Sequence, residues 1–424
     1  MQSQTYSVRT RAVLTLAAAL LFVTGIAASQ ATPVFSFYSV FGDALPIGGL
    51  TPDASGNLYG VTFYGGVYGN GMVYELSPAD GSSISGAWSM AVLYSFNPGS
   101  SDGWGPTSAP VFDSAGNLYG STEFGGTGGC SIFGCGTVYK LSPSGGARWT
   151  ETILHDFDGS DGWQIHPGLT IDSAGNLYGM ATGGGSYSAG TVFELSPSGS
   201  SWSLSVLHQF YGGSDGKAPF AALTLDSAGN LYGTASAGGG KSAACKFGCG
   251  IVFELSPSTN GAWTEKILHN FTTNANDGSQ PACHLTFDAS GNIYGTAGSG
   301  GGAANAGIVF ELSPMGNIWE EKILHNFNQH AADGAGPSNS LTFDAAGNLY
   351  GATIGGGTHG SGTAFKLAPA GGSWTETMLN NFSRQGAGGY FPNSGPIWGA
   401  DGNLYGIAAS GGRNNQGTVF EITP

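Results

Sequence analysis

Five aspartates, each followed by glycine, recur at similar intervals along the chain and are the first residues whose type and spacing could do chemistry. They are Asp102, Asp161, Asp215, Asp277 and Asp333. A rim of carboxylates could bind the hydroxyl groups of a sugar or a cation. Asp-Gly is also a strong turn signal, so the alternative is a plain loop between strands. The calcium-binding pattern Asp-x-Asp-x-Asp-Gly with its distal Glu is absent from the sequence, and we predict no metal site.

Aromatic and histidine residues that break the regularity of the chain gather near these aspartates. Aromatic rings beside carboxylates and histidines suit carbohydrate, because the C–H face of a sugar stacks on a ring while its hydroxyls need acceptors. The alternative is that these rings only cover the loops beneath them. The predicted ligand-binding residues are Asp102, Asp161, Asp215, Trp104, Trp163, His166, His330 and His359.

No recognised catalytic pattern is present in the sequence. We find no nucleophile elbow, phosphate loop or His-Glu-x-x-His, and we predict no catalytic residue and no cofactor. Four histidines share one repeated position in the string "LHxF", and a group repeated in this way is typical of packing rather than of a ligand site. They are His155, His208, His269 and His325.

The elements that must position these residues follow from an internal repeat. The string "GNLYG" or "GNIYG" begins at residues 56, 116, 175, 229, 291, 347 and 402. Each period holds four short apolar runs in fixed order, such as "LTFD", "GNLYG", "GTVFELSP" and "WTEKILHNF", with Gly, Ser, Pro and Asp in the gaps. Four strands per period predict an all-β fold, a seven-bladed β-propeller with four antiparallel strands per blade.

The two ends of the chain predict how the ring closes. The last repeat stops at "GTVFEITP", its third strand, while residues 34–41, "VFSFYSVF", resemble a degenerate fourth strand. We expect the N-terminal strand to pair as the outer strand of the last blade and close the ring. Residues 32–424 then form one domain, which we expect to be a monomer.

The first 31 residues have the features of a signal peptide. Arg9 and Arg11 precede an uncharged apolar stretch, Ala12 to Ala28, and small residues stand around Ala31. The stretch is shorter than the roughly 20 residues of a spanning helix. We therefore expect cleavage near Ala31 and a secreted or periplasmic protein, with membrane contact only if the segment stays uncleaved.

The cysteines fit an oxidising compartment. Cys130 with Cys135 and Cys245 with Cys249 form close pairs, which we expect to be disulfides that staple one loop each. No further Cys or His flanks either pair at zinc-ligand spacing. The fifth, Cys283, is predicted to be a buried thiol.

The charge balance excludes one class of partner. The formal net charge is −15, from 12 basic and 27 acidic residues. Binding to nucleic acid or to an anionic membrane needs clustered Lys and Arg, so we expect neither.

The repeat resembles that of a known family. "GNLYGTASAGG" at 229–239, followed by "GIVFELSP" at 250–257, is similar to strings of the exported tandem-repeat family called choice-of-anchor GloVer-repeat proteins. The likeness extends over nearly all of residues 32–424. It implies an exported bacterial repeat protein and no particular activity. A weaker, fold-level likeness links the chain to other propellers, including a streptogramin-inactivating lyase.

Together these features predict an exported recognition or scaffold module. Its partner would be an extracellular polysaccharide or a cell-surface protein. Two alternatives remain: a propeller lyase or glycoside-acting enzyme that uses the same face, and a structural surface protein with no small ligand.

Overall fold

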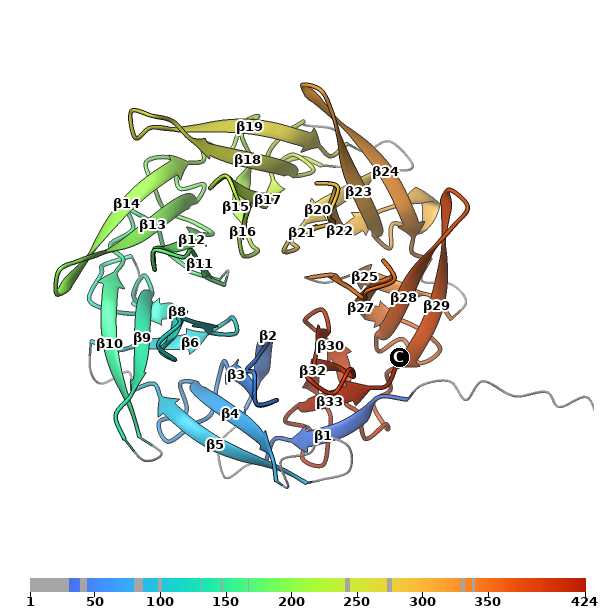
Figure 1. The fold of residues 1–424 in the computed structure, drawn as a ribbon, viewed down its shortest axis with the longest axis horizontal. Coiled ribbons are helices and arrows are strands. Elements are labelled where there is room, and N and C mark those ends of the chain that lie inside the picture. Colours follow the sequence, from blue (N-terminus) through green and yellow to red (C-terminus); the bar gives the residue numbers. More distant parts are fainter. Residues whose placement is uncertain are drawn as a thin grey trace, which may run out of the picture.

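The chain folds into seven antiparallel sheets arranged around a central opening in the computed structural model (Figure 1). The structure describes residues 30–38, 44–79, 87–97, 101–130, 132–145, 148–166, 168–240, 245–272, 277–328, 332–337 and 340–424. Within these residues the regular structure is strand, apart from one 3₁₀ turn, η2 (Gly302–Ala304). The predicted seven-bladed propeller is confirmed.

The strands of each blade lie side by side in order of distance from the central opening. They are given below with the innermost strand first. Blade 1 contains β2 (Pro46–Pro52), β3 (Leu58–Thr62), β4 (Met72–Pro78) and β5 (Trp88–Ser95). Blade 2 contains β6 (Gly103–Pro106), β7 (Val111–Phe112), β8 (Leu118–Gly125), β9 (Thr137–Pro143) and β10 (Trp149–Asp156). Blade 3 contains β11 (Thr170–Ile171), β12 (Leu177–Ala181), β13 (Thr191–Ser198) and β14 (Ser201–Gln209). Blade 4 contains β15 (Lys217–Pro219), β16 (Thr224–Leu225), β17 (Leu231–Ala237), β18 (Ile251–Pro257) and β19 (Trp263–Asn270).

The remaining blades follow the same order. Blade 5 contains β20 (Gly278–Pro281), β21 (Thr286–Phe287), β22 (Ile293–Gly300), β23 (Ile308–Met315) and β24 (Ile318–Asn326). Blade 6 contains β25 (Gly334–Pro337), β26 (Thr342–Phe343), β27 (Leu349–Gly356), β28 (Thr363–Ala370) and β29 (Ser373–Asn381). Blade 7 contains β30 (Tyr390–Pro392), β31 (Ile397–Trp398), β32 (Leu404–Ser410), β33 (Thr418–Ile422) and β1 (Thr32–Ser36). The innermost strand is split into two short pieces in five of the blades.

The first strand of the chain closes the ring, as the sequence predicted. β1 pairs antiparallel with β33, with Thr32 opposite Glu421 and Ser36 opposite Thr418. Figure 1 shows β1 at the outer edge of blade 7, beside blade 1. This pairing covers an edge that would otherwise expose unpaired backbone groups. Residues 39–41 of the predicted strand lie outside the described part of the chain.

The "GNLYG" string forms the hairpin between the first two strands of each blade. In blade 4 the carboxylate of Asp226 accepts hydrogen bonds from the backbone N–H groups of Ala228 and Asn230, both at 2.8 Å. It also accepts from Asn230 Nδ2 at 2.8 Å and from the hydroxyl of Tyr232 at 3.2 Å. Gly229 adopts φ 86°, a left-handed conformation that favours glycine.

The closing glycine of the string is required by close packing. A Cβ atom on Gly233 would lie 2.6 Å from Cζ of Phe253 on the adjacent strand. The aromatic ring therefore occupies the space that a side chain would need. The repeat combines one glycine for the turn with one for this contact.

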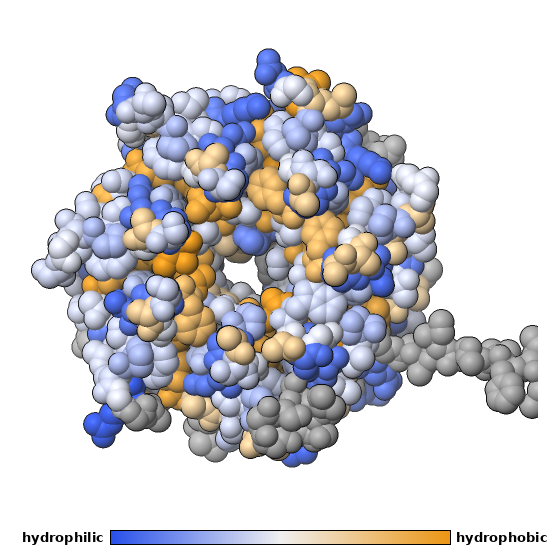
Figure 2. Space-filling view, viewed as in Figure 1, coloured by the Kyte–Doolittle hydropathy of each residue, from blue (hydrophilic) through white to orange (hydrophobic). Residues whose placement is uncertain are grey.

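Seven hydrophobic clusters, one at each junction between neighbouring blades, form the core of the described chain. At the junction of blades 4 and 5, Phe271 from the "LHNF" string packs edge-on against Phe310 with ring centroids 5.4 Å apart. Near the axis, threonine hydroxyls join neighbouring blades, as Thr224 Oγ1 donates to the carbonyl of Leu285 at 2.6 Å. Figure 2 shows hydrophobic residues in the grooves between blades and around the opening, whereas most protruding hairpin tips are hydrophilic. The β23–β24 hairpin is an exception, since Met315 and Ile318 are exposed there.

Replacing the turn carboxylate should destabilise a blade. Asp226→Ala removes the acceptor of four hydrogen bonds, and we expect it to lower the free energy of unfolding by about 1–3 kcal/mol. Ser227→Ala, at an exposed position of the same turn, should change it little. Chemical denaturation followed by tryptophan fluorescence measures both. Equal effects of the two substitutions would contradict this account of the turn.

Candidate ligand site on the loop face

One face of the ring is built from two sets of loops, and we call it the loop face. The Asp-Gly loops lead from the fourth strand of one blade to the first strand of the next, and the Gly-rich loops join the second and third strands. The two sets touch within a blade, because Gly239 N donates to Gly213 O and Gly301 N donates to Asp277 O, both at 2.9 Å. They therefore share one side of the molecule, as the sequence predicted.

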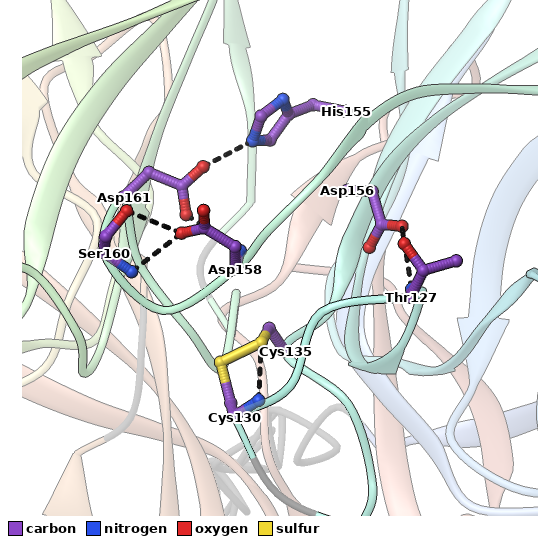
Figure 3. The surroundings of a disulfide bond; sticks show 8 residues. All are labelled: Thr127, Cys130, Cys135, His155, Asp156, Asp158, Ser160 and Asp161. Carbon is purple, nitrogen blue, oxygen red and sulfur yellow. Dashed lines mark hydrogen bonds and ion pairs between the residues drawn. A yellow bond between two sulfur atoms is a disulfide. The ribbon is translucent and has the colours of Figure 1, made fainter.

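Two of the Gly-rich loops are closed by disulfides. Cys130 is bonded to Cys135 and Cys245 to Cys249, which confirms both predicted pairs. Figure 3 shows the Cys130–Cys135 bond next to the Asp-Gly loop that carries Asp161. The two disulfides fit an extracellular or periplasmic protein.

The fifth cysteine is a buried thiol, as predicted. Cys283 is fully buried, and its sulfur accepts a hydrogen bond from Thr296 N at 3.1 Å. Burial raises the pKa of this thiol to about 11. It therefore stays protonated and unreactive at neutral pH.

Each disulfide-closed loop accepts a backbone hydrogen bond from a glutamine of the next blade. Gln164 N donates to Cys135 O at 3.1 Å, and Gln280 N donates to Cys249 O at 2.8 Å. Both glutamines have φ 58°, the left-handed region that costs a non-glycine residue energy. Ala218 and Phe391 adopt the same conformation and make the same contact in blades 4 and 7, so this is a feature of the repeat.

A groove of about 1050 Å³ lies on the loop face over blades 4 to 6. Three large apolar side chains line it and remain exposed: Phe220 by 44%, Phe247 by 76% and Ile354 by 46%. Phe247 comes from the loop closed by Cys245 and Cys249. The disulfide therefore fixes the loop that carries the most exposed ring of the groove.

Polar groups stand between these apolar side chains. Gln280 and Ser299 line the groove and are joined by a hydrogen bond from Ser299 Oγ to Gln280 Oε1 at 3.2 Å. Asp277 also lines it. Burial alone would raise the pKa of Asp277, but hydrogen bonds from His269 and Thr272 outweigh this and hold the pKa below its usual value. The groove therefore offers a carboxylate and an amide beside aromatic rings.

Of the predicted ligand residues, His166 lies nearest to this groove. Its ring stacks on Phe220, with centroids 4.8 Å apart, and its Nε2 lies 3.1 Å from Glu123 Oε1. Glu123 is 7% exposed and also accepts a hydrogen bond from Gln164 Nε2 at 3.3 Å. His166 thus positions one wall of the groove through Phe220.

The two predicted tryptophans pack into the blades around them and lie on other blades than the groove. Trp104 stacks on Phe124, with centroids 4.5 Å apart, and touches Phe63 edge-on. Trp163 forms a backbone bridge with Gly183, where a Cβ atom would lie 2.4 Å from the indole Nε1. Both rings are half-buried. These contacts pack one side of each ring against its own blade.

The carboxylates of the predicted aspartates accept hydrogen bonds from backbone N–H groups of their own loops. They lie at the junction between two blades. Asp102 accepts hydrogen bonds from Asn97 N and from the hydroxyl of Tyr94, both at 2.9 Å. Asp161 accepts from Asp158 N at 3.1 Å and lies 2.7 Å from His155 Nε2 (Figure 3).

The third aspartate has a longer contact. Asp215 accepts from Tyr211 N at 3.0 Å and lies 3.6 Å from His208 Nε2. Burial lowers the pKa of His208 to about 4, so its imidazole is neutral. The "LHxF" histidines thus pack at the junctions, as expected from their repetition, and also meet carboxylates there.

Of the last two predicted residues, only His359 is described, and it does not line the groove. His359 is exposed in the Gly-rich loop of blade 6, where its carbonyl accepts a hydrogen bond from Ser361 Oγ at 3.2 Å. His330 lies outside the described residues.

Sequence reasoning missed the residues that line the groove most openly. Gln280 precedes the proline that ends the first short strand, and Ile354 is the third residue after its "GNLYG" string. The latter position holds Phe63, Glu123, Thr182, Ser236, Gly298, Ile354 and Ala409 in the seven repeats. The residue type at this position varies although the neighbouring positions are nearly constant. This variation was the signal in the sequence that could have marked the position as part of a binding surface.

One junction carboxyl gives the protein a pH-dependent stability. Burial, with a further contribution from Asp102, raises the pKa of Glu151 from 4.5 to about 8, although its contact with Tyr94 opposes the shift. The folded protein therefore holds a proton on Glu151 that the unfolded chain loses above pH 4.5. By linkage, this group's contribution to stability decreases as the pH rises from about 4.5 to about 8.

Replacing this carboxyl by an amide should flatten the pH dependence. Glu151→Gln keeps a donor toward Asp102 without the titration, so its melting temperature should fall less between pH 5 and pH 8 than that of the unmodified protein, by roughly a few degrees. Glu320→Gln, the same change at an exposed position, should leave the slope unchanged. Calorimetry at four pH values measures both. Parallel pH profiles for Glu151→Gln and the unmodified protein would refute the assignment.

No helix of the described residues has the length and apolar character needed to cross a membrane, and residues 1–29 of the predicted signal segment lie outside the described part of the chain. No curated protein matches the sequence. Solved structures that resemble the fold include an oxidoreductase (glucose dehydrogenase), provisionally assigned, from Thermus thermophilus. It shows 16% identity and a TM-score of 0.40, with 74% of this chain and 95% of that chain covered.

Two further structures show similar values. A provisionally assigned 6-phosphogluconolactonase from Bacteroides uniformis ATCC 8492 has 15% identity and a TM-score of 0.48, covering 86% of this chain and 89% of that one. An α-L-arabinanase of Penicillium chrysogenum in complex with arabinobiose has 14% identity and a TM-score of 0.43, covering 74% and 91%. Similarity at this level carries no information about activity.

The sequence itself identifies the family. Residues 22–247 and again 241–424 match the family described as the Gloeobacter/Verrucomicrobia repeat, which confirms the resemblance found in the repeat strings. The chain therefore belongs to the Gloeobacter/Verrucomicrobia repeat family.

Proposed function

We propose that this protein is an exported recognition module that binds neutral carbohydrate in the groove on the loop face. The observation that carries the proposal is the pair of exposed rings, Phe220 and Phe247, beside hydrogen-bonding groups in one open groove. A sugar ring presents C–H groups that pack on an aromatic face and hydroxyls that need donors and acceptors at its rim.

The chemistry of the rim supports this class of ligand. Gln280 and Asn305 offer amides, Ser299 a hydroxyl and Asp277 a carboxylate, all along the same groove. The formal net charge of −15 disfavours polyanions, so a neutral polysaccharide fits better than an acidic one. Export through the predicted signal segment, which the disulfides fit, would bring the protein to such polymers.

The groove is open along the surface and runs over parts of three blades, from Phe220 in blade 4 to Ile354 in blade 6. An elongated open site suits a segment of a polymer better than a single small molecule. The disulfide of Cys245 and Cys249 and the left-handed Gln280 fix its walls before the ligand arrives, and this lowers the entropic cost of binding.

Removing the two rings should weaken binding. We expect Phe220→Ala/Phe247→Ala to raise the Kd for a neutral oligosaccharide roughly 5- to 150-fold, because two stacked rings contribute about 1–3 kcal/mol. The ligand is first chosen by screening the purified protein against a panel of neutral polysaccharides, and the Kd is then measured by isothermal titration calorimetry. Release of reducing ends is followed in the same samples, so that any turnover is detected.

Two further variants make this test specific. Tyr187→Ala/Tyr211→Ala removes two exposed rings of blade 3 that do not line the groove, and it should leave the Kd unchanged. Trp104→Ala/Trp163→Ala removes the tryptophans predicted from the sequence. Binding lost only in the tryptophan variant would move the site to blades 2 and 3. Absence of binding by folded protein across the panel would refute the carbohydrate proposal.

A further inference from the structure

Three successive junctions between blades bring together the same three side chains, one histidine, one aspartate and one glutamate. In each case the possible ligand atoms lie within 4.8 Å of one another. The histidine ends the outer strand of one blade, the aspartate lies in the Asp-Gly loop, and the glutamate belongs to the outer strand of the next blade. The three sets are His208, Asp215 and Glu265; His269, Asp277 and Glu321; and His325, Asp333 and Glu376.

A β-bulge allows one outer strand to serve two junctions. On β24 the side chains of Trp319 and Ile323 pack into the core shared with blade 4. The register shifts directly afterwards, between Ile323 and His325, while Leu324 and Phe327 pack into the core shared with blade 6. The extra residue turns the end of the strand toward the next blade. The strand thus supplies Glu321 to one cluster and His325 to the following one.

Other junctions of the same ring provide an internal comparison. Where Leu204 stands in place of the glutamate, His155 Nε2 lies 2.7 Å from Asp161, a direct hydrogen bond. Where Tyr94 replaces the histidine, its hydroxyl lies within hydrogen-bond distance of both Asp102 Oδ2 and Glu151 Oε2, at 2.9 Å from each. The imidazole of His155 and the hydroxyl of Tyr94 are thus satisfied by direct contact at these two junctions, although Glu151 Oε1 is buried there without a partner.

The three complete clusters make longer contacts, although His269 still hydrogen-bonds to Asp277. His208 Nε2 lies 3.6 Å from both Asp215 Oδ2 and Glu265 Oε1. His269 Nε2 lies 3.4 Å from Asp277 and 3.6 Å from Glu321.

The third complete cluster has the same open geometry. His325 Nε2 lies 3.5 Å from Asp333 and 3.8 Å from Glu376. Most of these separations are longer than a normal hydrogen bond.

Buried polar atoms are left without a partner as a result. His208 Nε2, Glu265 Oε1 and Glu321 Oε1 are buried and accept or donate no hydrogen bond. Such atoms cost free energy unless something satisfies them. A cation between the three side chains could satisfy these atoms, because the possible ligand atoms of each cluster lie within 4.8 Å of one another.

The separations between histidine nitrogen and carboxylate oxygen, 3.4–3.8 Å, lie close to those of a tetrahedral metal site. Zn²⁺ binds imidazole nitrogen and carboxylate oxygen at about 2.0–2.2 Å, which places neighbouring ligands about 3.4 Å apart. Ca²⁺ and Mg²⁺ prefer six or more oxygen ligands, and the imidazole disfavours both. Three protein ligands leave a fourth position for water.

We propose that these three clusters are metal sites, each binding one Zn²⁺ ion that bridges two neighbouring blades. Bonds from both blades and from the loop between them would fix the junctions of blades 3 with 4, 4 with 5 and 5 with 6. The role is structural: the ion replaces the direct hydrogen bonds that the other two junctions make.

Outer contacts hold the ligands in place for such a role. The carboxylate of Asp277 accepts hydrogen bonds from the backbone N–H and the hydroxyl of Thr272, at 2.7 and 2.8 Å. Asp333 accepts from Asn328 N at 2.9 Å. The imidazole of His269 packs edge-on against Phe271, with centroids 4.6 Å apart. Contacts of this kind orient the ligands of known metal sites.

The number of bound ions tests the proposal. The full chain, stripped with a chelator, is dialysed against Zn²⁺ buffered at micromolar free concentration, and the metal is counted by mass spectrometry. We expect three Zn²⁺ per chain and a higher melting temperature than for the stripped protein. Glu265→Gln, Glu321→Gln and Glu376→Gln should each reduce the count by one. Each should also remove part of the Zn²⁺-induced rise in melting temperature.

One substitution should create a site where the ring lacks one. Leu204→Glu places the missing carboxylate opposite His155 and Asp161, and it should raise the count from three to four. His155→Gln in the otherwise unmodified protein should leave the count at three. Stripped protein loaded with Co²⁺ should show visible absorption bands typical of tetrahedral coordination, weakened in each Gln variant.

Two results would overturn the proposal. The first is fewer than one Zn²⁺ per folded chain under these conditions. The second is a count that the three Gln substitutions leave unchanged while circular dichroism shows an intact fold, since this would place the metal elsewhere.

Discussion

The fold depends on one constraint, which is that no blade can cover its own hydrophobic faces. Each four-stranded sheet exposes apolar side chains on both sides, and only the neighbouring blades bury them. The fully buried phenylalanines of the "LHxF" strings, such as Phe271, lie at these junctions. The ring must therefore close, and β1 closes it by pairing with β33 at the far end of the chain.

The same constraint decides where polar chemistry can occur. Side chains near the ends of the outer strands are trapped between two blades, so any charge there must find a partner in the neighbouring blade or in the loop between them. The bulge in β24 directs Glu321 to one junction and His325 to the next. Side chains on the loop face reach solvent and need no partner in a neighbouring blade. Exposed rings can therefore stand there, such as Phe247 in a disulfide-closed loop at the groove.

Much of this architecture could be predicted from the repeat. The turn of Asp226 and Gly229, the count of seven blades, the closing strand and both disulfides follow from local strings that act over a few residues. The groove could not be predicted in the same way. Phe220 and Ile354 belong to different blades, and no local pattern states that they share one groove.

The sequence by itself therefore determined the elements, their number and the order in which they pair, because turn chemistry and the pairing of successive strands are local and repeat along the chain. The one distant pairing, of β1 with β33, followed from the strand missing from the last repeat. Only the tertiary structure decided which side chains meet. It placed Trp104 against Phe124 within blade 2, and it joined His166 to Phe220 across a junction. Contacts between blades depend on the rotation from each blade to the next and on single residues that differ between repeats, and this information exists only once the ring has closed.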